Sequence, residues 1–166
     1  MKILVECNTD KYLLTGILKK LRLSRKLIRH EANKPKVIDI LRKSDASIGV
    51  VDEDPHSSTP PDMANYQEIE RIGDIRILTR INDKRKKVFV ICPRMEEWLL
   101  KRANKNDISL NSFNLKNDPN TLHKINIDKN INYRNFVDNL IEVDDEISNL
   151  KTWVAKILNE AHTIPL

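Results

Sequence analysis

Two short apolar runs, each ending abruptly in a carboxylate, constrain the fold of this chain more than any other feature. Residues 3–5 lead directly into Glu6, and residues 48–51 lead directly into Asp52, with Asp54 two positions further on. Apolar runs this short, bounded by polar residues and turn formers, are typical of strands buried in a parallel sheet. Because ligands of such sheets bind outside the carboxyl ends of the strands, the three carboxylates are the first candidate functional residues.

The alternation of apolar runs and amphipathic stretches predicts an α/β fold, with a mostly parallel sheet flanked by helices. Asn8 or Thr9 can begin the first helix, and Pro35 lies in the first turn of the second. Residues 82–85 are expected to form a hairpin turn, and residues 55–62, with three prolines, a loop. The predicted elements are strands over residues 3–5, 27–32, 48–51, 75–81 and 87–91, and helices over residues 8–21, 33–43 and 93–103.

Three segments are expected along the chain. They are an α/β core over residues 1–103, an Asn-rich irregular segment over 104–135 with a short strand near 125–127, and one long amphipathic helix over 136–162. The helix is inferred from apolar residues spaced alternately four and three apart. These residues are Phe136, Leu140, Val143, Ile147, Leu150, Val154, Ile157 and Ala161.

The apolar seam of this helix has two possible partners. Packing along its own domain is the more common arrangement, whereas an exposed aliphatic stripe marks an interface with another protein. We expect part of the seam to bury against the core and the remainder to form a homodimer or to bind a protein partner. Asp144, Asp145 and Glu146 are assigned to the exposed face of the helix.

The carboxylates at the strand ends predict a metal site. Residues two apart on an extended segment face the same way, so Asp52 and Asp54 are expected to point together toward Glu6 in one water-filled cleft. Three convergent carboxylates repel one another unless a cation lies among them. Hard oxygen ligands of this kind suit Mg²⁺ or Mn²⁺, which retain waters and bind phosphates.

This set of motifs resembles the Toprim domain, which topoisomerases, bacterial primases, RecR-type recombination proteins and OLD-family nucleases share. The family's first motif is a hydrophobic strand ending in Glu and then Gly, with an Asp a few residues on. Glu6, Cys7 and Asp10 stand at these positions, so Cys7 replaces the usual Gly. The second motif, a strand ending in Asp-x-Asp, is similar to residues 52–54.

A third likeness is to OLD-type members of the family, in which a later strand precedes a helix that opens Ile-Glu-Asn-Tyr-Leu. Residues 95–99, Met-Glu-Glu-Trp-Leu, resemble this opening, with Glu96 at the acidic position. The resemblance covers residues 1–103 and implies a Toprim-like, Rossmann-like sheet.

The resemblance implies Mg²⁺-dependent cleavage of nucleic-acid phosphodiesters, as in a small nuclease of a phage-defence or repair system. Glu6, Asp52 and Asp54 would be the catalytic and metal-binding residues, with Asp10 and Glu96 as further metal ligands. The alternative is a non-catalytic Toprim-like module that binds nucleic acid or protein. The side chain in place of Gly favours this alternative, because it crowds the backbone where a phosphate would approach. A chance likeness, in an α/β domain with another role, also stays open.

The distribution of charge agrees with a nucleic-acid partner. The chain has a net charge of +5, and residues 1–50 carry 12 Lys and Arg against 5 Asp and Glu. The same charges can equally form a solvated surface, and a basic hairpin tip can serve only to block edge pairing. The candidate nucleic-acid-binding residues are Lys34, Lys36, Lys84, Arg85, Lys86, Lys87 and Arg94.

The sequence gives no indication of a membrane or secreted protein. The first apolar run is interrupted at Glu6, unlike that of a signal peptide, and no apolar stretch approaches the length of a membrane span. Cys7 and Cys92 have no CxxC partner or clustered His, so buried thiols are expected rather than a zinc site or a disulfide. We therefore expect a cytoplasmic protein.

Overall fold

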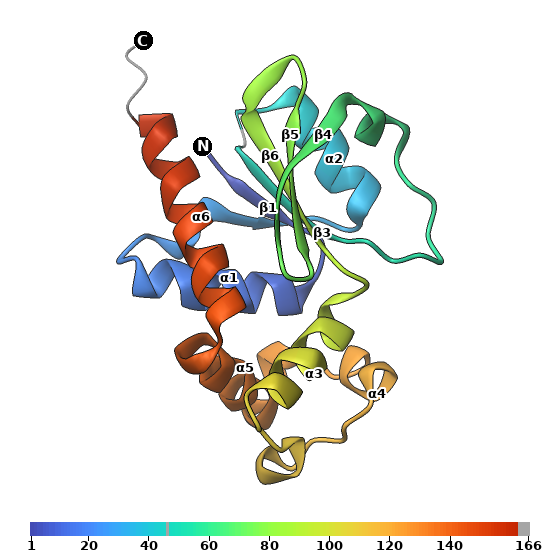
Figure 1. Cartoon of the computed structure of the whole chain (residues 1–166), viewed down its shortest axis with the longest axis vertical. Helices are drawn as coiled ribbons and strands as arrows, with labels where there is room; N and C mark the ends of the chain where they lie inside the picture. Colours follow the sequence, from blue (N-terminus) through green and yellow to red (C-terminus); the bar gives the residue numbers. More distant parts are fainter. Residues whose placement is uncertain (46, 163–166) are drawn as a thin grey trace.

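A mixed six-stranded sheet with helices on both faces organises the computed structural model, which describes residues 1–45 and 47–162 (Figure 1). The strands are β1 (Ile3–Val5), β2 (Ile28–His30), β3 (Ile48–Asp52), β4 (Tyr66–Ile72), β5 (Ile75–Arg80) and β6 (Asp83–Ile91). The α-helices are α1 (Asn8–Lys20), α2 (Lys34–Lys43), α3 (Met95–Lys105), α4 (Pro119–His123), α5 (Ile131–Val143) and α6 (Asp145–His162). Short 3₁₀ helices are η1 (Arg25–Leu27), η2 (Pro61–Asn65), η3 (Leu110–Phe113) and η4 (Ile127–Lys129).

The strand order is β2-β1-β3-β6-β5-β4. The strands β2, β1, β3 and β6 run parallel to one another. β5 pairs antiparallel with β6, and β4 pairs antiparallel with β5. The prediction of an α/β protein with a mostly parallel sheet is therefore confirmed. The hairpin of β5 and β6 is present too, although β6 begins at Asp83, inside the stretch expected to be its turn. The edge strand β4 was not predicted, because its five central residues are exposed and do not alternate between apolar and polar.

Apolar clusters cover both faces of the sheet. Ile3 and Val5 point into the larger cluster, to which α1, α3, α5 and α6 contribute. Leu4, between them, points into a smaller cluster on the opposite face, which α2 covers with residues such as Val37 and Leu41. This change of face from one residue to the next is the period of a strand that is buried on both sides.

The helices α3, α4 and α5 gather beyond the carboxyl ends of the parallel strands, in the lower half of Figure 1. Residues 104–135 hold η3, α4 and η4, and the short strand expected near residues 125–127 is wrong because η4 begins at Ile127. Leu110, Leu122 and Ile127 of this segment lie in the same apolar cluster as Ile3. The three segments expected from the sequence therefore share one hydrophobic core.

The single long helix predicted over residues 136–162 is wrong, because the chain forms two helices that meet at Asp144. Asp144 is extended, with φ −83° and ψ 129°. Its carboxylate accepts hydrogen bonds from Ile147 N (3.0 Å) and from Asn106 Nδ2 (2.7 Å). Asp144 thus caps the start of α6, a position that Asp favours. Asp144 and Glu146 are buried, at 2% and 4% exposure, so their assignment to an exposed face is wrong as well.

Most of the predicted apolar seam is buried within the chain. Its buried members are Phe136, Leu140, Ile147, Leu150, Val154 and Ile157, all in the larger apolar cluster. Val143 is half exposed, and the side chain of Ala161 lies outside the described residues. This burial favours packing along the seam's own domain, and the homodimer stays a prediction. Among the described residues, no helix is both long enough and apolar enough to cross a bilayer.

Glu146 ties α6 to α3 and to the turn between β4 and β5. Its carboxylate accepts hydrogen bonds from Trp98 Nε1 (2.8 Å), from Asp74 N (2.8 Å) and from the Arg102 guanidinium. Gly73 takes φ +53° in the turn, and a Cβ there would collide with the Glu146 carboxylate. Both oxygens of this buried carboxylate therefore have donors, one of them positively charged.

Candidate functional site

Four carboxylates from different segments lie together at the carboxyl end of the sheet. Glu6 follows β1, Asp10 lies in the first turn of α1, Asp52 ends β3, and Glu96 lies in the first turn of α3. Glu6 Oε2 accepts a hydrogen bond from Asp52 N at 3.4 Å. Asp10 and Glu96 are buried, whereas Glu6 and Asp52 are partly exposed. The structure thus brings together four of the five predicted metal ligands, which we call the acidic cluster.

Cys7 and Asp10 begin α1 with a reciprocal pair of hydrogen bonds. Asp10 N donates to Cys7 Sγ at 3.3 Å, and Cys7 N donates to Asp10 Oδ2 at 3.0 Å. This is a capping box in which a thiol takes the place of the usual hydroxyl. Cys7 is therefore the cap of the helix, rather than Asn8 or Thr9 as predicted. One Asp10 oxygen has a structural role, and burial raises the pKa of the Cys7 thiol, which keeps it protonated.

Burial and mutual repulsion raise the pKa values of three carboxyl groups in the acidic cluster. Burial, followed by the charge of Glu6, raises the pKa of Asp10 to about 7. Burial, followed by the charges of Asp10 and Glu6, raises the pKa of Asp52 to about 9. Burial also raises the pKa of Glu6, although the Asp52 amide and the Lys34 ammonium act against it. The cluster therefore holds protons at neutral pH that isolated carboxylates would release.

Two oxygens of the acidic cluster are buried without any hydrogen-bond partner, Asp10 Oδ1 and Asp52 Oδ1. Buried polar atoms in folded proteins are nearly always paired, so each exception calls for a physical reason. Both oxygens belong to groups with raised pKa values, and no Lys or Arg side chain forms an ion pair with either of them among the described residues. When they are ionised, Asp10 and Asp52 therefore have no positive side chain paired with them in the described part of the chain.

Asp54 is only loosely associated with the acidic cluster. The expectation that residues 52–54 stay extended is wrong, because β3 ends at Asp52 and Asp54 has φ +39°. The Asp54 carboxylate accepts a hydrogen bond from His56 N (3.2 Å), within the loop that follows. Its charge still contributes to the raised pKa of Glu6. The backbone turn explains why the spacing rule for strands did not apply here.

The expected single cleft is replaced by two cavities. Glu6 and Glu96 line a cavity of about 360 Å³ together with the start of α1, whereas Asp52 lines another cavity of about 520 Å³. Asp10 lines neither of them. The acidic cluster therefore borders two cavities, with Glu6 and Glu96 on the side of the smaller one.

His123, which was not predicted as a site residue, lies beside the acidic cluster. Its Nδ1 is 3.2 Å from Glu96 Oε1, and both residues line the cavity of about 360 Å³. The Glu96 side chain is 6% exposed and that of His123 is 65% exposed, so a buried carboxylate orients an accessible imidazole. His30, at the end of β2, lines the same cavity. No sequence motif indicated His123, because it lies 27 residues after Glu96 in the Asn-rich segment.

Three predicted basic residues lie near the carboxyl end of the sheet. Lys34 Nζ donates to the Glu53 carbonyl (2.7 Å) and to Ser57 Oγ (3.2 Å), so it fastens the loop after β3. Arg94 precedes α3 and donates to Glu97 Oε1 at 2.8 Å. Lys36 is exposed in the first turn of α2. These three positions are compatible with a phosphate that approaches the acidic cluster.

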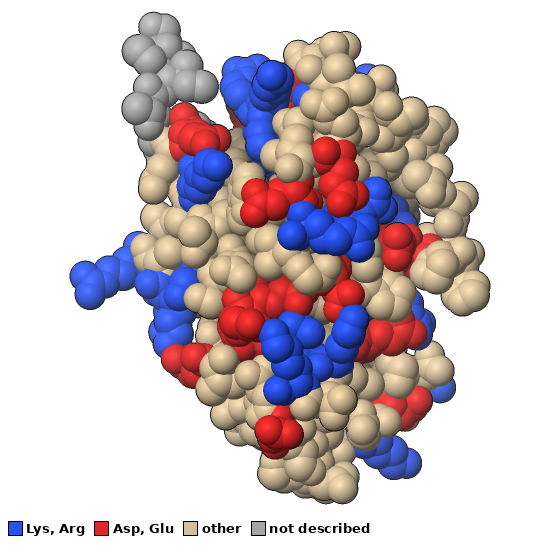
Figure 2. Space-filling view, viewed as in Figure 1, with Lys and Arg blue, Asp and Glu red and all other residues tan. Residues whose placement is uncertain are grey.

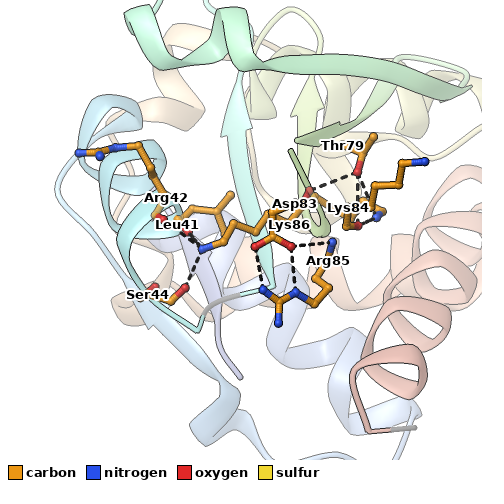
Figure 3. A network of polar contacts seen from close by, with 9 residues as sticks. Leu41, Arg42, Ser44, Thr79, Asp83, Lys84, Arg85 and Lys86 are labelled. Atoms are coloured by element: carbon orange, nitrogen blue, oxygen red, sulfur yellow. Dashed lines mark hydrogen bonds and ion pairs between the residues drawn. The ribbon is translucent and has the colours of Figure 1, made fainter. Parts of the chain in front are cut away.

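The predicted basic run at residues 84–87 lies at the other end of the sheet. Lys87 pairs with Ile48 and Ile91 with Asp52, so about 13 Å of strand separates Lys87 from the carboxyl end. Lys86 Nζ donates to the carbonyls of Leu41 and Ser44 at the end of α2 (Figure 3). The Lys87 ammonium donates to Thr79 Oγ1 at 3.2 Å and to the Lys84 carbonyl. Two of the four side chains therefore serve the fold, and only Lys84 and Arg85 are exposed.

The surface charge is mixed rather than separated. Figure 2 shows Lys and Arg next to Asp and Glu over the face in view, without a continuous basic patch. Within the part of the chain that the structure describes, no group of three or more His, Cys, Asp or Glu side chains is already arranged to hold a metal ion. A cation at the acidic cluster would therefore require its carboxylates to move closer together.

Comparison with known proteins leaves the family of this chain open. No model of a protein family matches the sequence, and no curated protein and no solved structure matches it significantly. The fold and the site must therefore carry any functional argument by themselves, and the likeness to the Toprim domain stays a prediction.

Proposed function

We propose that this protein hydrolyses phosphodiester bonds of nucleic acid with one or two divalent cations, Mg²⁺ or Mn²⁺, at the acidic cluster. The observation that carries the proposal is the pair of buried, unpartnered oxygens, Asp10 Oδ1 and Asp52 Oδ1, among four mutually repelling carboxylates. A cation that accepts oxygen ligands would satisfy both atoms and remove the repulsion. The order of the Toprim-like motifs supports the same site.

The donor set fits a hard cation. Every group in the acidic cluster offers carboxylate oxygens, which Mg²⁺ and Mn²⁺ prefer over nitrogen and sulfur. Glu6 is partly exposed on the side of the smaller cavity, so its side chain has room to turn toward Asp52. Because Asp10 and Asp52 hold protons near neutral pH, cation binding would release them.

When bound, such a cation lowers the pKa of water and stabilises charge on phosphate oxygens. Glu96 holds His123 by its Nδ1, which leaves Nε2 to accept a proton from the attacking water in the cavity. Lys34 and Arg94 place positive charge around the same end of the sheet. The Lys34 charge lowers the pKa of Glu6, and the charges of Glu96 and Asp54 raise the pKa of Arg94. These residues would attract and orient the phosphate.

Calorimetric titration with Mn²⁺ tests the metal site directly. The parent protein is expected to bind Mn²⁺ saturably with release of protons, and Asp52→Asn is expected to lose this binding. Glu142→Gln removes an exposed carboxylate from α5 and serves as the matched control, which should bind as the parent does. Equal binding by Asp52→Asn and the parent would reject Asp52 as a ligand.

A cleavage assay tests the reaction. Mixed single- and double-stranded DNA and RNA are incubated with the parent, with Glu6→Gln and with Glu142→Gln, all purified identically, in Mg²⁺ or Mn²⁺. Cleavage by the parent and by Glu142→Gln, but not by Glu6→Gln, is the expected result. Cleavage by all three proteins would indicate a contaminant. Saturable cation binding with no cleavage of any substrate would favour the non-catalytic module.

A further inference from the structure

The cavity of about 520 Å³ lies on the α2 face of the sheet, behind the acidic cluster. Its floor consists of Val51, Leu78 and Val90, from three neighbouring strands. The side chains of Met63 in η2 and Tyr66 in β4 also line it. Cavities of this size with mainly apolar walls and a few polar groups are typical of small-molecule sites. An aromatic ring, a thioether and aliphatic side chains together suit a flat heteroaromatic ligand.

The positive groups of this cavity already have partners. Lys34 Nζ donates to the Glu53 carbonyl and to Ser57 Oγ, and Glu53 contributes a negative charge to the same lining. Arg76 is also paired, since its Nε donates to Glu68 Oε2 at 2.6 Å. Charge complementarity therefore favours an uncharged ligand over a phosphate inside the cavity.

Tyr66 offers a buried hydroxyl on the cavity wall. The residue is 7% exposed, and its hydroxyl lacks a partner in good hydrogen-bond geometry, although it interacts with the Arg80 side chain. The Arg80 guanidinium lies over the ring, 5.4 Å from its centre, and partly offsets the burial that raises the Tyr66 pKa. A neutral ligand with donors and acceptors on its edge can pair with this hydroxyl, which a purely apolar ligand would leave unsatisfied.

We infer that this cavity binds one nucleobase of an unpaired nucleotide, so that the substrate is single-stranded nucleic acid. The inference about the substrate rests on the proposed function, whereas binding of the base does not. Asp52 both lines the cavity and belongs to the acidic cluster, so a base in the cavity holds its sugar–phosphate backbone next to the proposed cation. A base within a duplex is stacked and paired, so it must flip out before it can enter a cavity of this kind.

Titration with adenosine and cytidine, which carry no phosphate, tests the cavity without any cation. Methyl NMR signals of Met63, Leu78 and Val90 are expected to shift saturably. The methyl groups of Leu158, in the apolar cluster on the other face, are expected to stay unchanged. Phenol is the matched ligand control, because it has a flat ring but lacks the donors and acceptors of a base edge. Binding of phenol as tight as that of the nucleosides would mean an unselective apolar cavity and would overturn the inference.

A pair of tryptophan variants blocks the cavity selectively. Ala64 is exposed in η2 and lines the cavity, so Ala64→Trp is expected to fill it and abolish the nucleoside shifts. Gln67 is exposed on β4 and is not part of the lining, so Gln67→Trp should bind as the parent does. Nucleoside shifts that persist unchanged in Ala64→Trp, or that are absent from the parent, would overturn the inference.

Oligonucleotide binding in Ca²⁺, which is expected to support binding without cleavage, tests the substrate. The single strand is expected to bind at least tenfold tighter than the duplex of the same sequence, and Tyr66→Ala to weaken it by about tenfold, as expected for loss of base stacking. Duplex binding as tight as single-strand binding would overturn the substrate assignment.

The Mn²⁺ titration separates the two proposals. Ala64→Trp should bind Mn²⁺ as the parent does, because the variant blocks only the cavity. Nucleoside binding without Mn²⁺ binding would reject the proposed function and leave the inference about the cavity standing.

Discussion

Two groups of buried carboxylates in this protein have opposite surroundings. Glu146 accepts hydrogen bonds from an indole, a backbone amide and a guanidinium, and it joins three elements of the fold. Asp10 and Asp52 each keep one buried oxygen without a partner, and their neighbours are other carboxylates. The comparison shows that burial alone does not mark a functional acid. The absence of a positive partner separates Asp10 and Asp52 from Glu146, and it is the ground on which we propose a function for them.

The comparison predicts that removing Glu146 has the largest effect on stability. Glu146→Ala would leave Arg102 buried without a counter-charge and remove the acceptor of Trp98 Nε1, so the free energy of unfolding should fall by about 3–5 kcal/mol. Urea denaturation measures this loss. Asp145→Ala, at the exposed neighbouring position, is the control and should change stability little. If both variants unfold alike, Glu146 does not hold the helices together.

Addition of a divalent cation should stabilise the acidic cluster and leave the Glu146 region unaffected. At a Mn²⁺ concentration one hundred times its Kd, the free energy of unfolding should rise by about 2.7 kcal/mol. At one fixed Mn²⁺ concentration the gain should be larger at pH 8 than at pH 6, because fewer protons compete for Asp10 and Asp52 and the Kd is lower. Thermal denaturation with Mn²⁺ or with a chelator measures it. The same gain in Asp52→Asn would show that the cation binds elsewhere.

Asp52→Asn should stabilise the cation-free protein, opposite in sign to the loss at Glu146. Folding raises the pKa of Asp52 from 3.8 to about 9. Below pH 4 the carboxyl is protonated in both the folded and the unfolded state, and the protein has its full stability. As pH rises toward 9 this stability is lost, because only the unfolded state ionises Asp52 freely. Asn does not ionise, and its side-chain carbonyl can still accept a hydrogen bond from the Met95 backbone amide. The variant should therefore exceed the parent by about 2 kcal/mol at pH 8, after allowance for partial exposure. Urea denaturation in chelator from pH 5 to 9 measures the difference, and parallel pH curves would contradict it.

Asp144 gives the smallest effect and separates charge from hydrogen bonding. Asp144→Ala removes the cap of α6 and should lower the free energy of unfolding by about 1 kcal/mol. Asp144→Asn keeps an acceptor for Ile147 N and should retain nearly all of that stability, because Asn caps as well as Asp. Thermal denaturation of both variants decides the matter. A large loss in Asp144→Asn would mean that the charge itself is needed there.

The parts of the fold that the sequence predicted are those with a local cause. The runs before Glu6 and Asp52 are apolar throughout, as double burial in a sheet requires, and Asn33 with Pro35 marks the start of α2. The heptad seam predicted six of the buried residues in α5 and α6, but it wrongly included Val143 and did not reveal the break. At the break the Asp144 carboxylate also accepts a hydrogen bond from Asn106, which lies 38 residues earlier in the chain, and no local pattern predicts this contact.

The candidate site was predictable to the same extent. Glu6, Asp10, Asp52 and Glu96 were found because each follows a strand or begins a helix at the carboxyl end of the sheet. His123 was missed because its place beside Glu96 is set by the packing of α4 on α3, which no local pattern records. The basic run at residues 84–87 was assigned from composition alone. Hydrogen bonds to Leu41 in α2 and to Thr79 in the neighbouring strand β5 determine where the Lys86 and Lys87 side chains lie.

The contacts of Glu146 have a consequence for where this chain can be shortened or fused. The same helix α3 carries Glu96 in its first turn and, further along, Trp98 and Arg102, which Glu146 holds from α6. A chain that stops before Asp145 would lose this hold on α3, and Glu96 would lose its fixed place beside His123. A truncated protein would therefore lose the arrangement of the acidic cluster, although it would retain all four carboxylates of that cluster.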